Sequence, residues 1–163
     1  MSIKRLLIMA GALMTVTCGF AQEKKAPEGR LIYCSYACSR PAGLGKDYCE
    51  LIADIGTSPQ VVVSLYNNNR FKEKVQRTFE VTEQDVEQLQ QLLTKLKVYE
   101  LDGYKHDEKL DGGATYRIYQ EYASGEKINA VWSGHKIKPE AKAAYYRIEL
   151  FFEPWRSKVE THD

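Results

Sequence analysis

The stretch VVVSLYNNNRFKEKVQRTFEVTEQDVEQLQQLLTKLK, residues 61–97, decides the fold class of this chain. Val61, Val63 and Leu65 occupy every second position, which is the period of a strand, and a mostly apolar alternation resumes over residues 71–81. Between the two runs lie three asparagines, residues 67–69, and Asn tolerates the positive φ that a tight turn requires. The stretch therefore predicts an antiparallel hairpin.

A helix is predicted directly after this hairpin, from Thr82 to about Lys97. Thr82 fits an N-cap, and Asp85 three residues later completes a short form of the capping box. Apolar residues then recur at three- and four-residue spacing, at Val86, Leu89, Leu93 and Leu96. One face of the helix is therefore expected to pack against the strands.

The sequence on either side of this stretch predicts further strands and a second helix. Residues 31–38 and 48–54 have strand composition and complete a four-strand meander, while residues 114–122 and 127–132 flank a Ser-Gly turn. Pro139 suits a first helical turn and Pro154 a helix stop, with an apolar stripe between them at Ala141, Ala144, Tyr145, Ile148 and Phe152. We expect an α+β fold, an antiparallel sheet of about six strands with two helices packed on one face.

The first 21 residues have the pattern of a signal peptide. A basic start precedes an apolar run of about eleven residues, and Gly19 and Ala21 are small residues before the expected cut. That run is well short of the roughly 20 residues that span a bilayer. We predict a signal peptide at 1–21, a flexible leader at 22–29, a single domain at 30–155 and a polar tail at 156–163. Lipidation of Cys18 is the alternative, which would give a lipid-anchored structural protein.

Composition and charge narrow the possible partners. The 163 residues include 23 Lys and Arg against 22 Asp and Glu, with 44% hydrophobic residues, as in one ordinary globular domain. Removal of residues 1–21 takes away two basic residues and no acid, which leaves a net charge of −1. Such a chain has no field that would attract nucleic acid or an anionic membrane. We expect no nucleic-acid partner, and membrane attachment only through Cys18.

Three cysteines remain after the expected cut. A hairpin through residues 39–48 would bring Cys49 opposite Cys38, so we predict a disulfide between them and a buried thiol at Cys34. Pairing of Cys34 with Cys49 requires a different strand register and remains the alternative.

The densest group of possible metal ligands is the acidic loop with Asp102, Asp107 and Asp111. Its spacing is not that of a calcium loop, and Lys105 and Lys109 place positive charges among the acids. A solvated loop is the favoured interpretation, and no cofactor is expected.

Motifs of catalysis do not occur in this chain. It has no Gly-x-Ser-x-Gly elbow, no His-Glu-x-x-His and no phosphate-binding glycine loop. His135 is the one histidine that could serve as a base, although an exposed turn histidine is the commoner interpretation. The sequence favours a non-enzymatic protein, with a small periplasmic hydrolase or hydrolase inhibitor as the alternative, in which His135 and the loop acids would converge.

Aromatic residues are the remaining functional signal, because the chain has 11 Tyr and 2 Trp. On the second hairpin Tyr116 and Tyr122 share one face, whereas Tyr119 points to the other, and one of these faces is expected to be open. Tyrosine offers a large rigid contact with a polar tip. We predict a binding site at Tyr116, Tyr119, Tyr122 and Trp132 for an unknown protein, peptide or glycan of the cell envelope.

The order of these features resembles a known group of proteins. A meander with Cys34 and Cys38, a helix after Val-Thr-Glu-Gln-Asp at residues 81–85, and an Asp-Gly-Gly entry to a hairpin at residues 111–113 are similar to small exported proteins of unknown function from Gram-negative bacteria. The resemblance implies a periplasmic or secreted location. It brings no catalytic residue with it.

Overall fold

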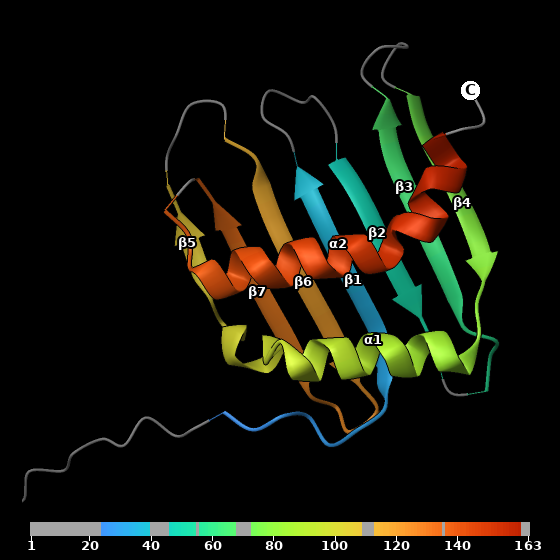
Figure 1. Ribbon diagram of the computed structural model, residues 1–163, viewed down its shortest axis with the longest axis horizontal. Helices are drawn as coiled ribbons and strands as arrows, with labels where there is room; N and C mark the ends of the chain where they lie inside the picture. Colours follow the sequence, from blue (N-terminus) through green and yellow to red (C-terminus); the bar gives the residue numbers. More distant parts are fainter. Residues whose placement is uncertain are drawn as a thin grey trace, which may run out of the picture.

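Seven strands form one sheet, and two helices lie across one of its faces (Figure 1). The computed structural model describes residues 24–39, 46–54, 56–67, 73–108, 113–134 and 136–160. The elements in chain order are β1 (Leu31–Ser39), β2 (Lys46–Ile52), β3 (Gln60–Asn67), β4 (Glu73–Glu80), α1 (Glu83–Lys95), a 3₁₀ helix (Val98–Leu101), β5 (Lys105–Asp107), β6 (Thr115–Tyr122), β7 (Lys127–Ser133) and α2 (Pro139–Glu160). The predicted α+β class, with both helices on one face, is confirmed.

The strand order is β4-β3-β2-β1-β6-β7-β5, which makes β1 the central strand. The predicted meander of β1 to β4 and the β6–β7 hairpin are both present. The sheet is mixed, however, because β5 pairs with β7 in parallel at the edge. This seventh strand was missed because three residues are too few to show an alternating pattern.

The core lies between the sheet and the two helices. Helix α1 contributes Val86, Leu89 and Leu93 to it, as its periodicity predicted, and the predicted stripe of α2 is buried throughout. At the centre of the sheet Tyr36 packs against α2, with its ring centroid 5.4 Å from that of Tyr145. Because this face is buried against both helices, alternation fixes the direction of the β1 side chains from Tyr33 onward, after a register irregularity between Leu31 and Tyr33.

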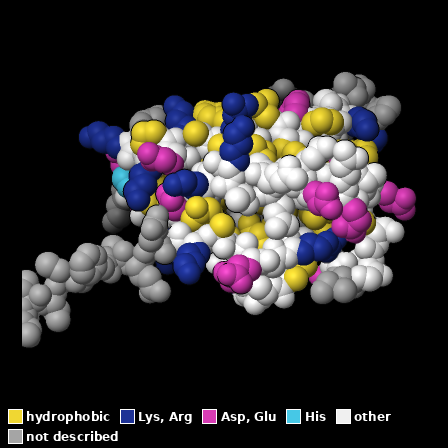
Figure 2. Space-filling view, turned by 60° about the horizontal axis from the view of Figure 1, so that its bottom comes forward, with side chains coloured by type: hydrophobic (Ala, Val, Ile, Leu, Met, Phe, Trp, Pro, Cys, Tyr) yellow, Lys and Arg dark blue, Asp and Glu magenta, His cyan; other side chains and the backbone are white. Residues whose placement is uncertain are grey.

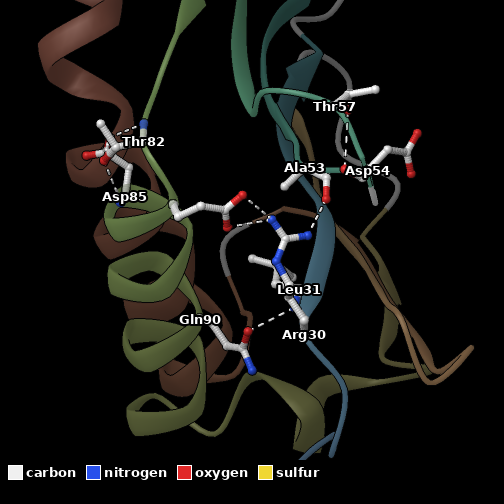
Figure 3. Close-up of polar contacts among 9 residues, drawn as sticks. Arg30, Leu31, Ala53, Asp54, Thr57, Thr82, Asp85 and Gln90 are labelled. Atoms are coloured by element: carbon white, nitrogen blue, oxygen red, sulfur yellow. Dashed lines mark hydrogen bonds and ion pairs between the residues drawn. The ribbon is translucent and has the colours of Figure 1, made fainter.

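The start of β1 is tied to α1 and to the end of β2 by polar contacts (Figure 3). The Arg30 guanidinium pairs with the Glu83 carboxylate at 2.6 Å and donates to the carbonyl oxygen of Ala53. The Gln90 amide accepts from the Leu31 backbone N–H at 2.8 Å. Residues before Arg30 also touch the domain: the Glu28 N–H donates to Glu126 at 3.2 Å, inside the leader that was predicted to be flexible.

Helix α2 does not stop at Pro154, as the sequence suggested, but continues to Glu160. A proline removes one helical hydrogen bond, to the carbonyl four residues earlier, and both Pro154 and Leu150 are exposed, so water can satisfy that carbonyl. The last turns are then held by packing, because Val159 is buried and Arg156 pairs with Glu149 at 3.0 Å. Residues 156–160 therefore belong to the domain and not to a polar tail.

The predicted disulfide between Cys38 and Cys49 is wrong for this structure, in which no disulfide joins Cys34, Cys38 and Cys49. Cys49 lies opposite Tyr36 on β1, while Cys38 lies opposite Asp47. The β1–β2 register is therefore two residues away from the one that would set the two cysteines side by side. The alternative partner, Cys34, lies opposite Leu51, so it does not face Cys49 either.

The cap of α1 gives a test of the fold. Thr82 accepts from the Asp85 N–H at 3.2 Å, and Asp85 accepts from the Thr82 N–H at 2.8 Å (Figure 3). Thr82→Ala removes half of this reciprocal cap and is expected to lower the free energy of unfolding by about 1 kcal/mol in urea titrations followed by circular dichroism. Thr94→Ala in the exposed last turn of the same helix is the matched control, with an effect near zero because Ala is the better helix former and the Thr94 hydroxyl donates only to the Gln90 carbonyl, which is already part of the helix. Equal effects of the two changes would contradict the capping role.

Candidate functional site

The sheet face away from the helices carries a groove of about 840 Å³. Both helices lie on the other face, so no described helix covers it (Figure 1). We call it the tyrosine groove, and its lining comes from five strands: Tyr33, Ser35 and Ala37 of β1, Tyr48 of β2, Ser64 and Tyr66 of β3, Lys74 of β4, and Arg117, Tyr119 and Glu121 of β6. Its volume lies within the range of small-molecule and cofactor sites.

The floor of the groove is low because small residues alternate with large ones across the strands. Ala37 lies between Tyr48 on β2 and Arg117 on β6, and Ser64 is the next neighbour of Tyr48 on β3. Ala37 is 4% exposed and Ser64 is 3% exposed, although both are on the open face. The large neighbours therefore rise around a floor of small side chains and make a hollow in an otherwise continuous sheet.

One wall is a hydrogen-bonded group of two tyrosines and a carboxylate. The hydroxyls of Tyr33 and Tyr48 both donate to the same oxygen of Glu50, from Tyr33 at 2.5 Å, and they also contact each other. Burial raises the pKa of both phenols above its ordinary value, and the hydrogen bond to Glu50 raises it further. The two rings are thus held in place before any ligand arrives.

The opposite wall is built around Tyr119 of β6. Its hydroxyl donates to Glu121, which also pairs with Lys127 at 3.1 Å. The hydrogen bond from Tyr119 and then the one from Lys127 hold the pKa of the Glu121 carboxyl below its ordinary value. The Arg117 guanidinium lies 5.3 Å from the centre of the Tyr119 ring, and this ring meets Tyr33 edge-on with centroids 5.9 Å apart. The two walls therefore meet at one place, where the Tyr33 ring contacts the Tyr119 ring.

The third side of the groove lies on β3 and β4, where Tyr66 and Lys74 are directly opposite each other. Lys74 is exposed. The groove therefore combines rings, small hydroxyl-bearing residues and basic groups on both flanks.

Figure 2 shows the surface of the molecule with the bottom of Figure 1 turned forward. Hydrophobic side chains appear there as separate small areas between basic and acidic ones (Figure 2). Among the described residues, the large hydrophobic side chains classed as exposed are Tyr146 and Leu150, both on α2. The tyrosine groove is therefore the better candidate for a site.

The structure divides the predicted binding residues between the two faces of the sheet. Tyr119 lines the groove, as an open-face residue. Tyr122 and Trp132 are 3% and 1% exposed in the core, and Tyr116 packs on Trp132 and Tyr145 under α2. The prediction that Tyr116 and Tyr122 share one face is confirmed, but that face is the one the helices cover. Tyr116 and Trp132 still line a small pocket of about 130 Å³ beside α2, whereas Tyr122 is not among its lining residues.

The acidic loop is used for local structure. Asp102 accepts from the Asn129 N–H at 3.1 Å, and Asp107 accepts from the Ser133 hydroxyl at 2.8 Å. Within the described ranges no group of three or more His, Cys, Asp or Glu side chains is placed to hold a metal ion. Asp111 and His135, the remaining candidates from the sequence, lie outside the described residues.

Sequence reasoning missed most of the groove, although a signal for it was present. If the apolar Cys49 and Leu51 face the core, as the period of Val63 and Leu65 also indicates for the next strand, their direct neighbours in the sequence face outward. This alternation places Tyr48, Ser64 and Tyr66 on the open face. Two tyrosines and a serine facing outward on adjacent strands were the pattern to look for.

Comparison with protein-family models and with curated proteins finds no match to this chain. In the part of the chain that the structure describes, no helix has the length and apolar character needed to cross a bilayer.

The raised pKa of Tyr48 gives a test of the groove's internal bonding. A phenol in the unfolded chain loses its proton near pH 10, whereas Tyr48 in the folded protein keeps it, so the folded state loses stability as the pH rises above about 10. Tyr48→Phe removes this contribution, and we expect its free energy of unfolding to fall less steeply than that of the wild type between pH 9 and 11 in urea titrations. Tyr146→Phe on α2 is the control for the same change outside the groove. Identical slopes for the wild type and Tyr48→Phe would show that Tyr48 is not held as described.

Proposed function

We propose that this protein is an exported, non-enzymatic binding module whose ligand is a glycan held in the tyrosine groove. The observation that carries the proposal is the fixing of three tyrosine rings by hydrogen bonds within the protein: Tyr33 and Tyr48 through Glu50, and Tyr119 through Glu121. Rings held in position lose little freedom when a ligand is bound, which is the basis of preorganised binding.

Binding is favoured over catalysis because the groups of the groove whose pKa is shifted do not change their protonation state near neutral pH. General acid–base catalysis near neutral pH requires groups whose pKa lies close to the working pH. The pKa values of Tyr33, Tyr48 and Tyr119 are raised from an ordinary value that is already far above neutral, and that of Glu121 is lowered. These groups therefore keep one protonation state at pH 7, which suits recognition.

A glycan is favoured over a peptide by the place of the groove on a sheet face. Extended peptides commonly bind by adding a strand to a sheet edge, where backbone groups are unpaired. Nine of the ten lining residues lie on β1, β2, β3 and β6, whose backbones pair with neighbours on both sides, and the edge strand β4 contributes only Lys74. It offers instead ring faces, which match the apolar faces of sugar rings.

Removal of one wall tests this site. Tyr119→Ala deletes a ring that contacts Arg117 and Tyr33, and we expect affinity for a bound oligosaccharide to fall about tenfold, equivalent to about 1.4 kcal/mol. Tyr146→Ala, which removes an exposed tyrosine from α2, is the matched control and should leave affinity unchanged. Binding is measured first on arrays of immobilised oligosaccharides and of peptides, then by titration calorimetry with the glycans retained. Groove-dependent binding of peptides alone would refute the glycan class, and binding that both variants retain in full would refute the site.

Export is a separate part of the proposal and has its own test. The basic and apolar pattern of residues 1–21 supports it, although these residues lie outside the described ranges. Mass spectrometry of the protein from the envelope fraction of its own cells is expected to find a mature chain that begins at Gln22. A lipid-modified Cys18 would replace the soluble protein by an anchored one, and an intact chain with Met1 in the cytosol would contradict export.

A further inference from the structure

We infer that the glycan bound in the tyrosine groove is acidic, a chain of sugar rings whose carboxylates pair with Arg117 and Lys74. This inference rests on the proposed function and adds the charge and the extent of the ligand. It is carried by two exposed basic side chains on opposite flanks of the groove, together with the engagement of the nearby carboxylates by other groups.

Arg117 is positioned to bind an anion. Its Nε donates to Asn129 at 3.1 Å and its guanidinium lies over the Tyr119 ring, so both the direction and the plane of the group are constrained. Among the described residues it forms no ion pair. A guanidinium presents paired N–H donors that match the two oxygens of a carboxylate, and a constrained guanidinium loses less freedom when it binds one.

Lys74 supplies a second cation from the other flank, on β4. It lines the groove, is exposed, and makes no ion pair within the described ranges. Four strand intervals separate β4 from β6, which corresponds to about 19 Å across the sheet. One sugar ring cannot reach from one cation to the other, whereas a chain of several rings can lie along the groove and contact both.

The carboxylates near the groove are already engaged. Glu121, the one acid in its lining, accepts from Tyr119 and pairs with Lys127. Glu50 is held by the two phenols of the first wall. The basic groups of the lining therefore face a ligand without a neighbouring acid to neutralise them, which is the charge complement of an anionic chain.

Ser64 on the floor adds a small hydroxyl-bearing side chain on β3, between the strands that carry the two cations. Since Ser64 lines the groove, a sugar hydroxyl of the ligand can form a hydrogen bond with it.

Matched pairs of probes test the charge. Titration calorimetry compares tetragalacturonate and a hyaluronan tetrasaccharide with their carboxyl-reduced, neutral counterparts. We expect at least one acidic probe to bind about tenfold tighter than its neutral counterpart, with an affinity that falls as salt is added. Arg117→Gln and Lys74→Gln should each lower that affinity several-fold and reduce its salt dependence. Lys95→Gln, at an exposed position of α1, removes the same charge elsewhere and should change neither.

Arg117→Lys separates the fork of the guanidinium from its charge. It keeps the salt dependence but loses the paired donors, so an affinity between those of the wild type and Arg117→Gln is expected. Because Arg117 and Lys74 are exposed, thermal melts of these variants should match the wild type and exclude loss of the fold as the cause.

Other outcomes overturn the inference or the proposal beneath it. Equal binding of acidic and neutral probes, with loss in Tyr119→Ala, would leave a glycan site and remove its acidic specificity. Arg117-dependent binding of polyglutamate with no saccharide binding would assign the groove to acidic peptides. Binding of none of these probes, combined with no groove-dependent signal on the glycan array, would remove both the inference and the proposed function.

Discussion

The structure depends on the two-residue period of β1, the central strand of the sheet. Cys34 and Tyr36 face the helices, while Tyr33, Ser35 and Ala37 face the groove. A slip of one residue against β2 or β6 would exchange the two sets, so that the small floor residues would face the core and Tyr36 would face water. The core and the groove are therefore consequences of the same register, and neither can change alone.

Three sets of contacts hold that register. The Arg30 guanidinium and the Gln90 amide bind the start of β1 to α1, so the strand enters the sheet at a fixed height. In the middle of β1, the Tyr36 ring packs against the Phe152 ring of α2, with their centroids 5.5 Å apart. Its two neighbours β2 and β6 pair with it over almost its whole length. Because both helices pack on the core side, the surface of the opposite face is formed by the side chains of the strands.

The sequence predicted the parts of the fold that a repeating pattern encodes. The meander, the helix with its Thr82 cap and the buried stripe of α2 were all predicted, because period and capping chemistry are local. The pairing of Cys38 with Cys49 failed because register depends on how the whole β1–β2 hairpin turns, which alternation does not encode. β5 and the last turns of α2 were missed because pairing at a sheet edge and packing of Val159 are tertiary effects.

The candidate site, too, depends on tertiary packing that a local sequence pattern does not encode. Parity correctly separated Tyr119 from Tyr116 and Tyr122, but it cannot say which of two aromatic faces the helices will cover. That outcome depends on the other strands as well: Trp132 and Ile118 join the covered side, and the hydrogen-bonded Tyr33 and Tyr48 join the open one. The groove is a property of five strands together, so no single hairpin could reveal it.

The internal bonding of the groove also constrains how it can recognise a ligand. The hydroxyls of Tyr33, Tyr48 and Tyr119 are already occupied by Glu50 and Glu121, so a ligand that competed for them would first have to break charge-assisted hydrogen bonds. In the proposed site the phenols therefore act mainly through their ring faces, and directional polar contact falls to the terminal nitrogens of Arg117 and Lys74 on the flanks. Selectivity in this site should thus follow the charge and the length of the ligand more than its individual hydroxyls.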